Sequence, residues 1–219
     1  PLSEGALRQI MARLTRLNRL ETGTIYIQIT RGVARRDHSF PKHSLASLVM
    51  TVKHVSLDTG RQLAGKSAIT VPDQRWDRRD IKTIQLLPNC LAKQAASEKG
   101  AYEAIMVMPD GSVSEGSSSN VWILNNENQL ITRQPDEDIL NGITRQSIQR
   151  IASERQIEIV ERSVSVDEMM QAKEVFVTSA TSMVTALTHI DGQKIDEGKV
   201  GLIASALKAD YINYVETCS

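Results

Sequence analysis

The chain has 219 residues, of which 41% are hydrophobic and 24% are charged, and its 26 basic and 26 acidic residues give a formal net charge of zero. These values are ordinary for a soluble globular protein, and the lack of net positive charge argues against a nucleic-acid-binding protein. No apolar run approaches the ~20 residues that cross a bilayer, and the two distant cysteines suggest neither a disulfide framework nor a metal site. We therefore expect a cytoplasmic protein without membrane, nucleic-acid or metal partners.

The first part of the chain predicts one helix and two strands. Ser3 precedes an amphipathic pattern of leucines, isoleucine and methionine, which predicts a capped helix of about four turns. Alternating isoleucines over residues 24–30 predict a half-buried strand. A charged loop follows over 31–41, and residues 45–55, which are apolar on both faces, predict an interior strand.

The rest of the chain predicts an α+β fold. The expected strands are 68–72, 104–108, 120–124, 130–133, 158–164, 174–179 and 184–190, and the expected helices are 86–99, 143–155, 167–171 and 200–215. Turn residues between the strands from 102 to 133 are typical of a β-meander. Because meanders are followed here by single helices, we predict α+β rather than a doubly wound α/β sheet. No G-x-G-x-x-G pattern opens a helix, which argues against a Rossmann cofactor site.

Lys82 lies in the charged segment 80–83, near an expected strand end. A lysine among charged residues is usually a solvated surface residue. It becomes a nucleophile toward a carbonyl cofactor only if burial or nearby cations activate it, and Arg78 and Arg79 are the candidate cations. Taken alone, this segment favours the surface interpretation.

Residues 114–120 carry Glu115 just before a run of small hydrogen-bond donors that includes Ser118. Such a run is most often a polar loop. The alternative is functional, because a carboxylate beside a pyridine nitrogen keeps the ring protonated and makes it a better electron sink.

Two further segments offer amides and hydroxyls at the ends of expected elements. At residues 141–145, Asn141 or Thr144 is expected to be an ordinary N-cap, whereas the functional alternative is a phosphate-binding helix start. Residues 178–182 follow a strand and are equally compatible with a simple turn. Neither segment is specific by itself.

The order and spacing of these segments, together with Arg31-Gly32 and the loop Arg36-x-His38-x-Phe40-Pro41, resemble the class IV pyridoxal-phosphate aminotransferases. Within this family the pattern is most similar to the D-amino-acid aminotransferases. The resemblance runs from about Ile10 to the C-terminal helix.

This resemblance implies a domain organisation. Residues 67–219 are expected to form the large cofactor-binding domain of the family, a β pseudo-barrel with flanking helices. Residues 56–66 are the expected linker, and 1–55 the expected remnant of the small N-terminal α+β domain, most of which the chain is expected to lack.

The resemblance also implies roles for single residues. Lys82 matches the lysine that forms a Schiff base with pyridoxal 5'-phosphate and transfers the proton, and Glu115 matches the carboxylate that faces the pyridine nitrogen. The remaining cofactor contacts that it implies are Ser118, Leu140, Ile143, Thr144, Ser179 and Ala180. Ala180 is a departure, because relatives commonly have a threonine there that donates to the phosphate.

Arg36 and His38 match the pair that binds the α-carboxylate of the substrate in D-amino-acid aminotransferases, and arginine suits this role because it binds carboxylates bidentately. The implied reaction is transamination between a D-alanine-type donor and a 2-oxoglutarate-type acceptor, in a homodimer. Branched-chain transamination, aminodeoxychorismate lyase chemistry on the same fold, and a truncated non-catalytic domain remain the alternatives.

Overall fold

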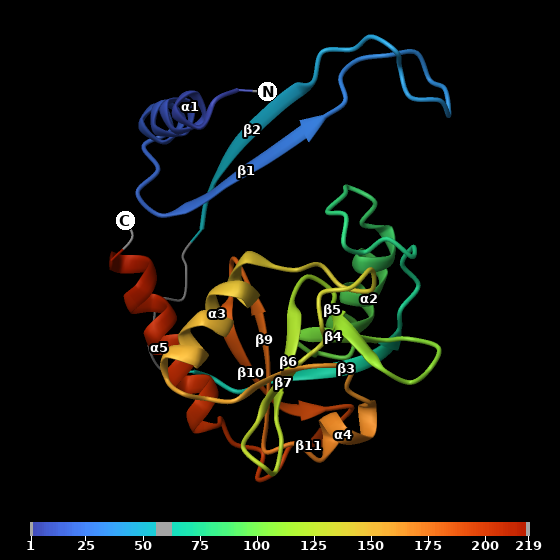
Figure 1. Ribbon diagram of the computed structural model, residues 1–219, viewed down its shortest axis with the longest axis vertical. Helices are drawn as coiled ribbons and strands as arrows, with labels where there is room; N and C mark the ends of the chain where they lie inside the picture. The colour runs from blue at the N-terminus through green and yellow to red at the C-terminus, as the bar shows by residue number, and fades with distance from the viewer. Residues whose placement is uncertain (1, 56–62, 218–219) are drawn as a thin grey trace. The chain divides into compact units, whose positions relative to one another are not determined.

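The computed structural model describes residues 2–55 and 63–217, and the chain divides into two compact units, Pro1–Asp58 and Thr59–Ser219 (Figure 1). Most of the linker expected at 56–66 lies outside the described residues. The assignment of the first unit as a remnant of the small domain stays a prediction. Within the described ranges, no helix combines the length and the apolar character needed to span a membrane.

The first unit consists of helix α1 (Glu4–Leu17) and the antiparallel strands β1 (Gly23–Thr30) and β2 (Ser47–His54). The Ser3 hydroxyl accepts a hydrogen bond from the Ala6 amide at 3.3 Å, so the predicted N-cap is confirmed. The two predicted strands are also present.

The prediction that the second strand is interior is wrong. Over the described length of β1 and β2, no residue is buried, and β2 pairs with β1 in a two-stranded sheet. Its apolar residues on both faces therefore do not mark a central strand, and Val49 is half exposed. A two-stranded sheet has no interior strand position, whatever the composition of its strands.

The second unit is built on one mixed sheet with the order β5-β4-β3-β10-β9-β6-β7-β8, to which β11 is added by pairing with β10. Its strands are β3 (Lys66–Pro72), β4 (Glu103–Val107), β5 (Val113–Gly116), β6 (Asn120–Leu124), β7 (Leu130–Thr132), β8 (Ile159–Glu161), β9 (Glu174–Ser179), β10 (Met183–Ile190) and β11 (Gln193–Lys194). The pairs β3–β4, β3–β10 and β7–β8 are parallel, and the other strand pairs of this sheet are antiparallel. The α+β class that the sequence predicts is confirmed.

The predicted meander is wrong at one junction. Strands β4 and β5 form one hairpin and β6 and β7 another, but β6 pairs with β9 and not with β5. Trp122 on β6 lies opposite Phe176 on β9, and their rings stack with centroids 5.9 Å apart. Both side chains are fully buried, so this aromatic pair holds the two strands together.

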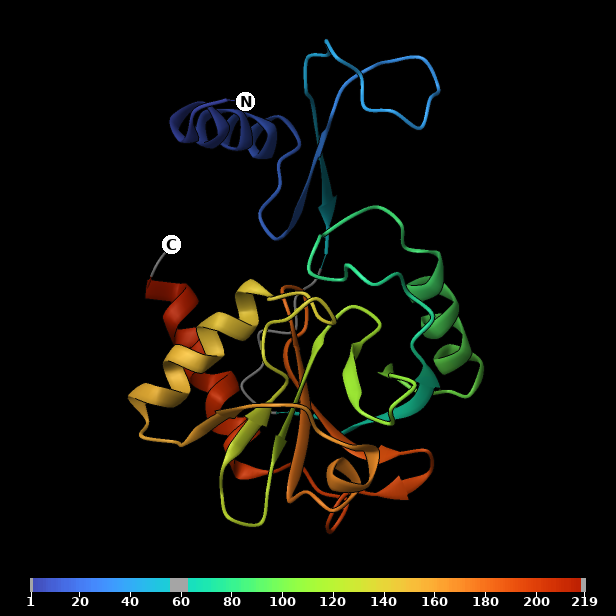
Figure 2. The ribbon, with the colours of Figure 1, turned by 45° about the vertical axis from the view of Figure 1, so that its right-hand side comes forward.

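Helices cover the sheet from different sides (Figure 2). Helix α2 (Leu87–Glu98) packs against β3 and β4, and its buried Ala92 and Ala96 let it approach closely. Helices α3 (Ile143–Glu154) and α5 (Leu202–Thr217) lie side by side over the core that contains the aromatic pair. The short helix α4 (Val166–Met170) completes the unit.

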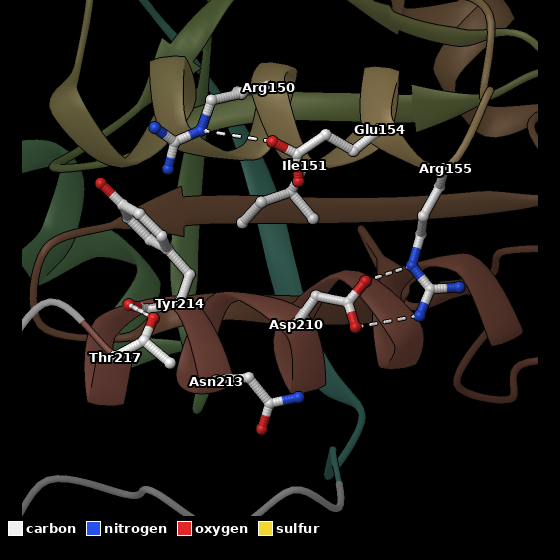
Figure 3. A pocket seen from close by; sticks show the side chains of 8 residues that line it. All are labelled: Arg150, Ile151, Glu154, Arg155, Asp210, Asn213, Tyr214 and Thr217. Carbon is white, nitrogen blue, oxygen red and sulfur yellow. Dashed lines mark hydrogen bonds and ion pairs between the residues drawn. The ribbon is translucent and has the colours of Figure 1, made fainter.

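A surface hollow lies between α3 and α5 (Figure 3). Arg155 forms an ion pair with Asp210 across it, with one nitrogen–oxygen distance of 3.0 Å. The Arg150 guanidinium lies 4.2 Å from the centroid of the Tyr214 ring. These contacts join the two helices, and none of the predicted site residues lines this hollow.

Candidate active site

A pocket of about 540 Å³ in the second unit brings the four polar segments of the sequence together. Its lining includes every residue that was expected to bind a cofactor, namely Lys82, Glu115, Ser118, Leu140, Ile143, Thr144, Ser179 and Ala180. These residues come from the segment before α2, from β5, from the β5–β6 turn, from the start of α3 and from the end of β9. The sheet order explains why they meet, because β6 and β9 are hydrogen-bonded neighbours although more than fifty residues separate Asn120 from Thr178, their paired ends.

Lys82 lies in the segment between β3 and α2, and its side chain is exposed on the pocket wall. The two arginines that the sequence offered as activating cations are paired with carboxylates. Arg78 Nη2 lies 2.8 Å from Asp80, and Arg79 Nη1 lies 3.0 Å from Asp138. The amine of Lys82 is therefore accessible at the pocket, while the charges of both candidate activating arginines are compensated by carboxylates.

The sequence suggested that Glu115 lies in a polar loop, but the structure places it in β5, where it is buried. Its Oε1 forms an ion pair with Arg75, and its Oε2 accepts from Asn120 Nδ2 at 3.0 Å and from the Leu140 amide at 3.2 Å. Burial raises the pKa of Glu115 to about 7, although Arg75 and the Leu140 amide act in the opposite direction. A carboxyl group with this pKa exchanges its proton near neutral pH.

Asn120 connects Glu115 to the start of α3. The same Asn120 Nδ2 group that donates to Glu115 also donates to the Leu140 carbonyl at 2.8 Å. The Asn120 Oδ1 atom lies against Gly142 so closely that a Cβ atom there would approach it to 2.5 Å. One amide side chain thus fixes the carboxylate and the turn that enters the helix.

The prediction that Asn141 or Thr144 caps α3 is wrong. The N-cap is Gly142, and among the described residues no side chain makes a capping hydrogen bond to this helix. Asn141 Oδ1 instead accepts from Arg145 Nη1 at 3.1 Å, and Thr144 is buried on the pocket wall. Free amides at the positive end of a helix suit an anion such as a phosphate.

Of the three serines in the β5–β6 turn, which all line the pocket, only Ser118 is exposed. The hydroxyls of Ser117 and Ser119 donate to the buried carboxylate of Glu103 at 2.5 and 2.8 Å. Ser118 between them is exposed and lines the pocket. Glu103 therefore binds the hydroxyls of both neighbours and leaves Ser118 as the exposed serine of the turn.

The end of β9 and the turn after it form a further part of the pocket lining. The Thr178 hydroxyl accepts from the Trp122 indole at 3.0 Å, which ties the turn to the aromatic core. The Ser179 and Ser182 hydroxyls lie 2.6 Å apart. Ala180 and Thr181 are exposed and line the pocket.

Sequence reasoning missed four buried polar side chains: Arg75 and Asn120, which line the pocket, and Asp73 and Glu103, which do not. Asp73 and Arg75 follow Pro72 and resemble ordinary turn residues, and Glu103 resembles an exposed strand end. Only Asn120 had a usable signal, since an amide at the start of an apolar strand has to find hydrogen-bond partners when it is buried.

The predicted substrate-binding pair lies in the first unit. Arg36 and His38 are exposed in the loop between β1 and β2, where the Asp37 side chain accepts from the His38 amide at 2.6 Å. The guanidinium of Arg31 lies 3.9 Å from the ring centroid of Phe40 in the same loop. The role of Arg36 and His38 stays a prediction.

Solved structures share this fold. The branched-chain amino acid aminotransferase of Escherichia coli superposes with a TM-score of 0.83 at 23% identity, covering 97% of this chain and 73% of that chain. A branched-chain aminotransferase from the archaeon Thermoproteus uzoniensis with norvaline superposes with a TM-score of 0.78 at 24% identity, covering 98% of this chain and 72% of that chain. A putative 4-amino-4-deoxychorismate lyase from Legionella pneumophila superposes with a TM-score of 0.79 at 19% identity, covering 95% of this chain and 74% of that chain. At these identities the similarity establishes the fold.

Sequence comparison establishes the family. Residues 1–190 match the family described as amino-transferase class IV. The D-alanine aminotransferase of Staphylococcus aureus (strain N315) is 39% identical over 214 residues, which are 97% of this chain and 75% of the relative. The D-alanine aminotransferase of Bacillus licheniformis is 39% identical over 199 residues, 91% of this chain and 70% of the relative. The chain belongs to the class IV aminotransferases.

Proposed function

We propose that the protein transfers the amino group of D-amino acids to 2-oxo acids, with pyridoxal phosphate as its cofactor. The observation that carries this proposal is the presence in one pocket of an accessible lysine amine, a buried carboxylate and an uncapped helix start. D-alanine is the proposed type of donor and 2-oxoglutarate the proposed type of acceptor.

The residues of the pocket fit this cofactor. Its volume of about 540 Å³ is within the usual range of small-molecule sites. Glu115 would face the ring nitrogen and Leu140 the ring. The amides of Ile143 and Thr144, the Thr144 hydroxyl and Ser179 would hold the phosphate, with Ser118 and the backbone of Ala180 beside them. The uncapped amides of α3 supply the anion site that a phosphate requires.

The chemistry divides between the cofactor and the chain. Pyridoxal phosphate, when bound, supplies a conjugated ring that takes up the electrons released as the α-proton of the substrate leaves. Lys82 Nζ would accept that proton from the α-carbon and later release it. Glu115 would hold a proton at the ring nitrogen, for which its pKa of about 7 is suited.

The choice of D-amino acids is supported by two observations. Relatives at 39% identity are D-alanine aminotransferases, and the loop between β1 and β2 carries the Arg36-x-His38 pattern. The branched-chain aminotransferases and the lyase share the fold at 24% identity or less. We also propose a homodimer, the commonest symmetric assembly of soluble enzymes.

The test is a comparison of substrates on the full chain supplied with pyridoxal phosphate. We expect pyruvate to form from D-alanine and 2-oxoglutarate, with far slower turnover of L-leucine and no 4-aminobenzoate from aminodeoxychorismate. Faster turnover of L-leucine, or release of 4-aminobenzoate, would move the protein to one of the other reactions of this fold. A protein that shows neither turnover nor the visible absorbance of a lysine-bound cofactor would be non-catalytic.

A further inference from the structure

A chain of alternating charges lies directly behind Glu115. Arg75 forms ion pairs with two carboxylates at once, with Glu115 through Nη1 and with Asp73 through Nη2 at 2.6 Å. The three side chains are 8% exposed or less. A buried guanidinium with two carboxylate partners is fully compensated, which a buried charge requires.

Asp73, at the far end of this row of charges, accepts several hydrogen bonds. It accepts from Arg75 Nε and from the Arg75 amide, both at 3.0 Å, and from the Ser114 hydroxyl at 2.7 Å. Arg79 Nε lies 3.3 Å from the same carboxylate, and Arg79 is paired in turn with Asp138. Asp73 therefore has more donors than Glu115 and competes with it for the charge of Arg75.

The opposite side of Glu115 is occupied by neutral donors. Asn120 and the Leu140 amide bind Oε2, while Arg75 binds Oε1. The charged groups that act on Glu115 are thus Arg75 in direct contact and Asp73 beyond it, and Asp73 is paired in turn with Arg79. Two carboxylates share one guanidinium, and only Glu115 of the two lines the pocket.

We propose that Arg75 and Asp73 are positioning residues for Glu115. Arg75 fixes the direction of the Glu115 carboxylate, and Asp73 offsets the charge of Arg75. Glu115 therefore keeps its affinity for a proton that it shares with a ligand in the pocket. This inference rests on the proposed function, because the ligand is the cofactor and the proton is shared with its ring nitrogen. It assigns a task to two residues that contact neither the phosphate-binding amides nor Lys82 in the described contacts.

The acid–base properties of the two carboxylates agree with this division. Burial raises the pKa of Glu115, and the neighbouring Asp73 acts in the same direction, while Arg75 opposes both. Burial acts on Asp73 as well, but the hydrogen bonds from Arg75 and Ser114 outweigh it and hold the pKa of Asp73 below its usual value. Asp73 thus stays ionised over the range in which Glu115 exchanges its proton.

The experiment measures the pKa of Glu115 in the full chain without cofactor, by NMR of carboxyl-labelled glutamate assigned through Glu115→Gln. Removing the cation with Arg75→Gln should raise this pKa by about one to three units, as expected when a contacting opposite charge is lost. Removing the anion with Asp73→Asn should lower it. Asp77→Asn removes an exposed charge from the same segment and should leave it unchanged.

Opposite shifts support the proposal, because a purely structural role would not produce shifts of opposite sign. If Asp73→Asn does not fold, its effect is measured in the Arg75→Gln background, where no buried cation remains unpaired, and a downward shift is again expected. Shifts in the same direction, or shifts no larger than that of Asp77→Asn, would overturn the proposal. Because no turnover is measured, this outcome is independent of the assay with D-alanine.

Discussion

Asn120 and Gly142 approach each other so closely that a Cβ atom at Gly142 would lie 2.5 Å from Asn120 Oδ1. The Asn120 side chain cannot simply turn away, because its amide nitrogen donates to Glu115 and to the Leu140 carbonyl. The position of the carboxylate and the entry into α3 therefore depend on the missing side chain of residue 142.

Gly142→Ala should displace Asn120 and disturb both contacts. We expect destabilisation of about 1–3 kcal/mol, as for other overpacked sites, and at least tenfold weaker binding of pyridoxal phosphate. Urea denaturation and a cofactor titration measure these effects. Gly5→Ala is the control, because a Cβ there meets open space on helix α1 and should leave both values unchanged or slightly raise the stability.

Lys82→Ala should abolish transamination of D-alanine, with a loss of at least about a thousandfold in kcat, because nucleophile and proton acceptor are removed together. Pyruvate formation measures the loss. Lys99→Ala is the matched control, since Lys99 is exposed at the end of α2 and outside the pocket. Normal turnover by Lys82→Ala would refute the assignment of the catalytic lysine.

The burial of Glu115 predicts an unusual pH dependence of stability. Its pKa rises from 4.5 to about 7 in the folded protein, so the folded state binds this proton more tightly than the unfolded chain. The contribution is fully present below about pH 4.5 and is lost as the pH rises through about 7. It amounts to about 3 kcal/mol.

The measurement compares wild type and Glu115→Gln by urea denaturation at a series of pH values, without cofactor. The wild-type free energy of unfolding minus that of the variant should fall between pH 4.5 and 7. The contributions of other titratable groups to the free energy of unfolding cancel in this difference where the groups titrate alike in both proteins. A difference that rises over this range would show that Glu115 is ionised by its partners in spite of burial.

Arg36→Ala should raise the KM for D-alanine by about ten- to a hundredfold, the effect of losing a charge-assisted hydrogen bond to a carboxylate. The visible spectrum of the bound cofactor should not change. Arg35→Ala is the control, because Arg35 is the neighbour of Arg36 in the same loop and its side chain is also exposed. Equal effects of the two variants would indicate that the loop acts only through its overall charge.

Most helices and strands of the second unit could be predicted from local patterns with small errors at their ends, but β5 and the short β11 were not predicted. In the first unit, alternation marked β1 and Ser3 marked the start of α1, because period and capping are properties of neighbouring residues. The interior position assigned to β2 failed, since composition does not state how many strands a sheet has. The β6–β9 pairing was equally hidden, because it joins distant parts of the chain.

The candidate site divides in the same way. By itself the sequence determined the class of protein and predicted that Lys82, Glu115 and Thr144 belong to one site, because their order and spacing along the chain form a recognisable pattern. Only the tertiary structure decided that Arg75 and Asp73 stand behind Glu115 and that Gly142, not Asn141, begins α3. Burial and ion pairing arise when distant segments meet, and no local pattern of residues encodes that meeting.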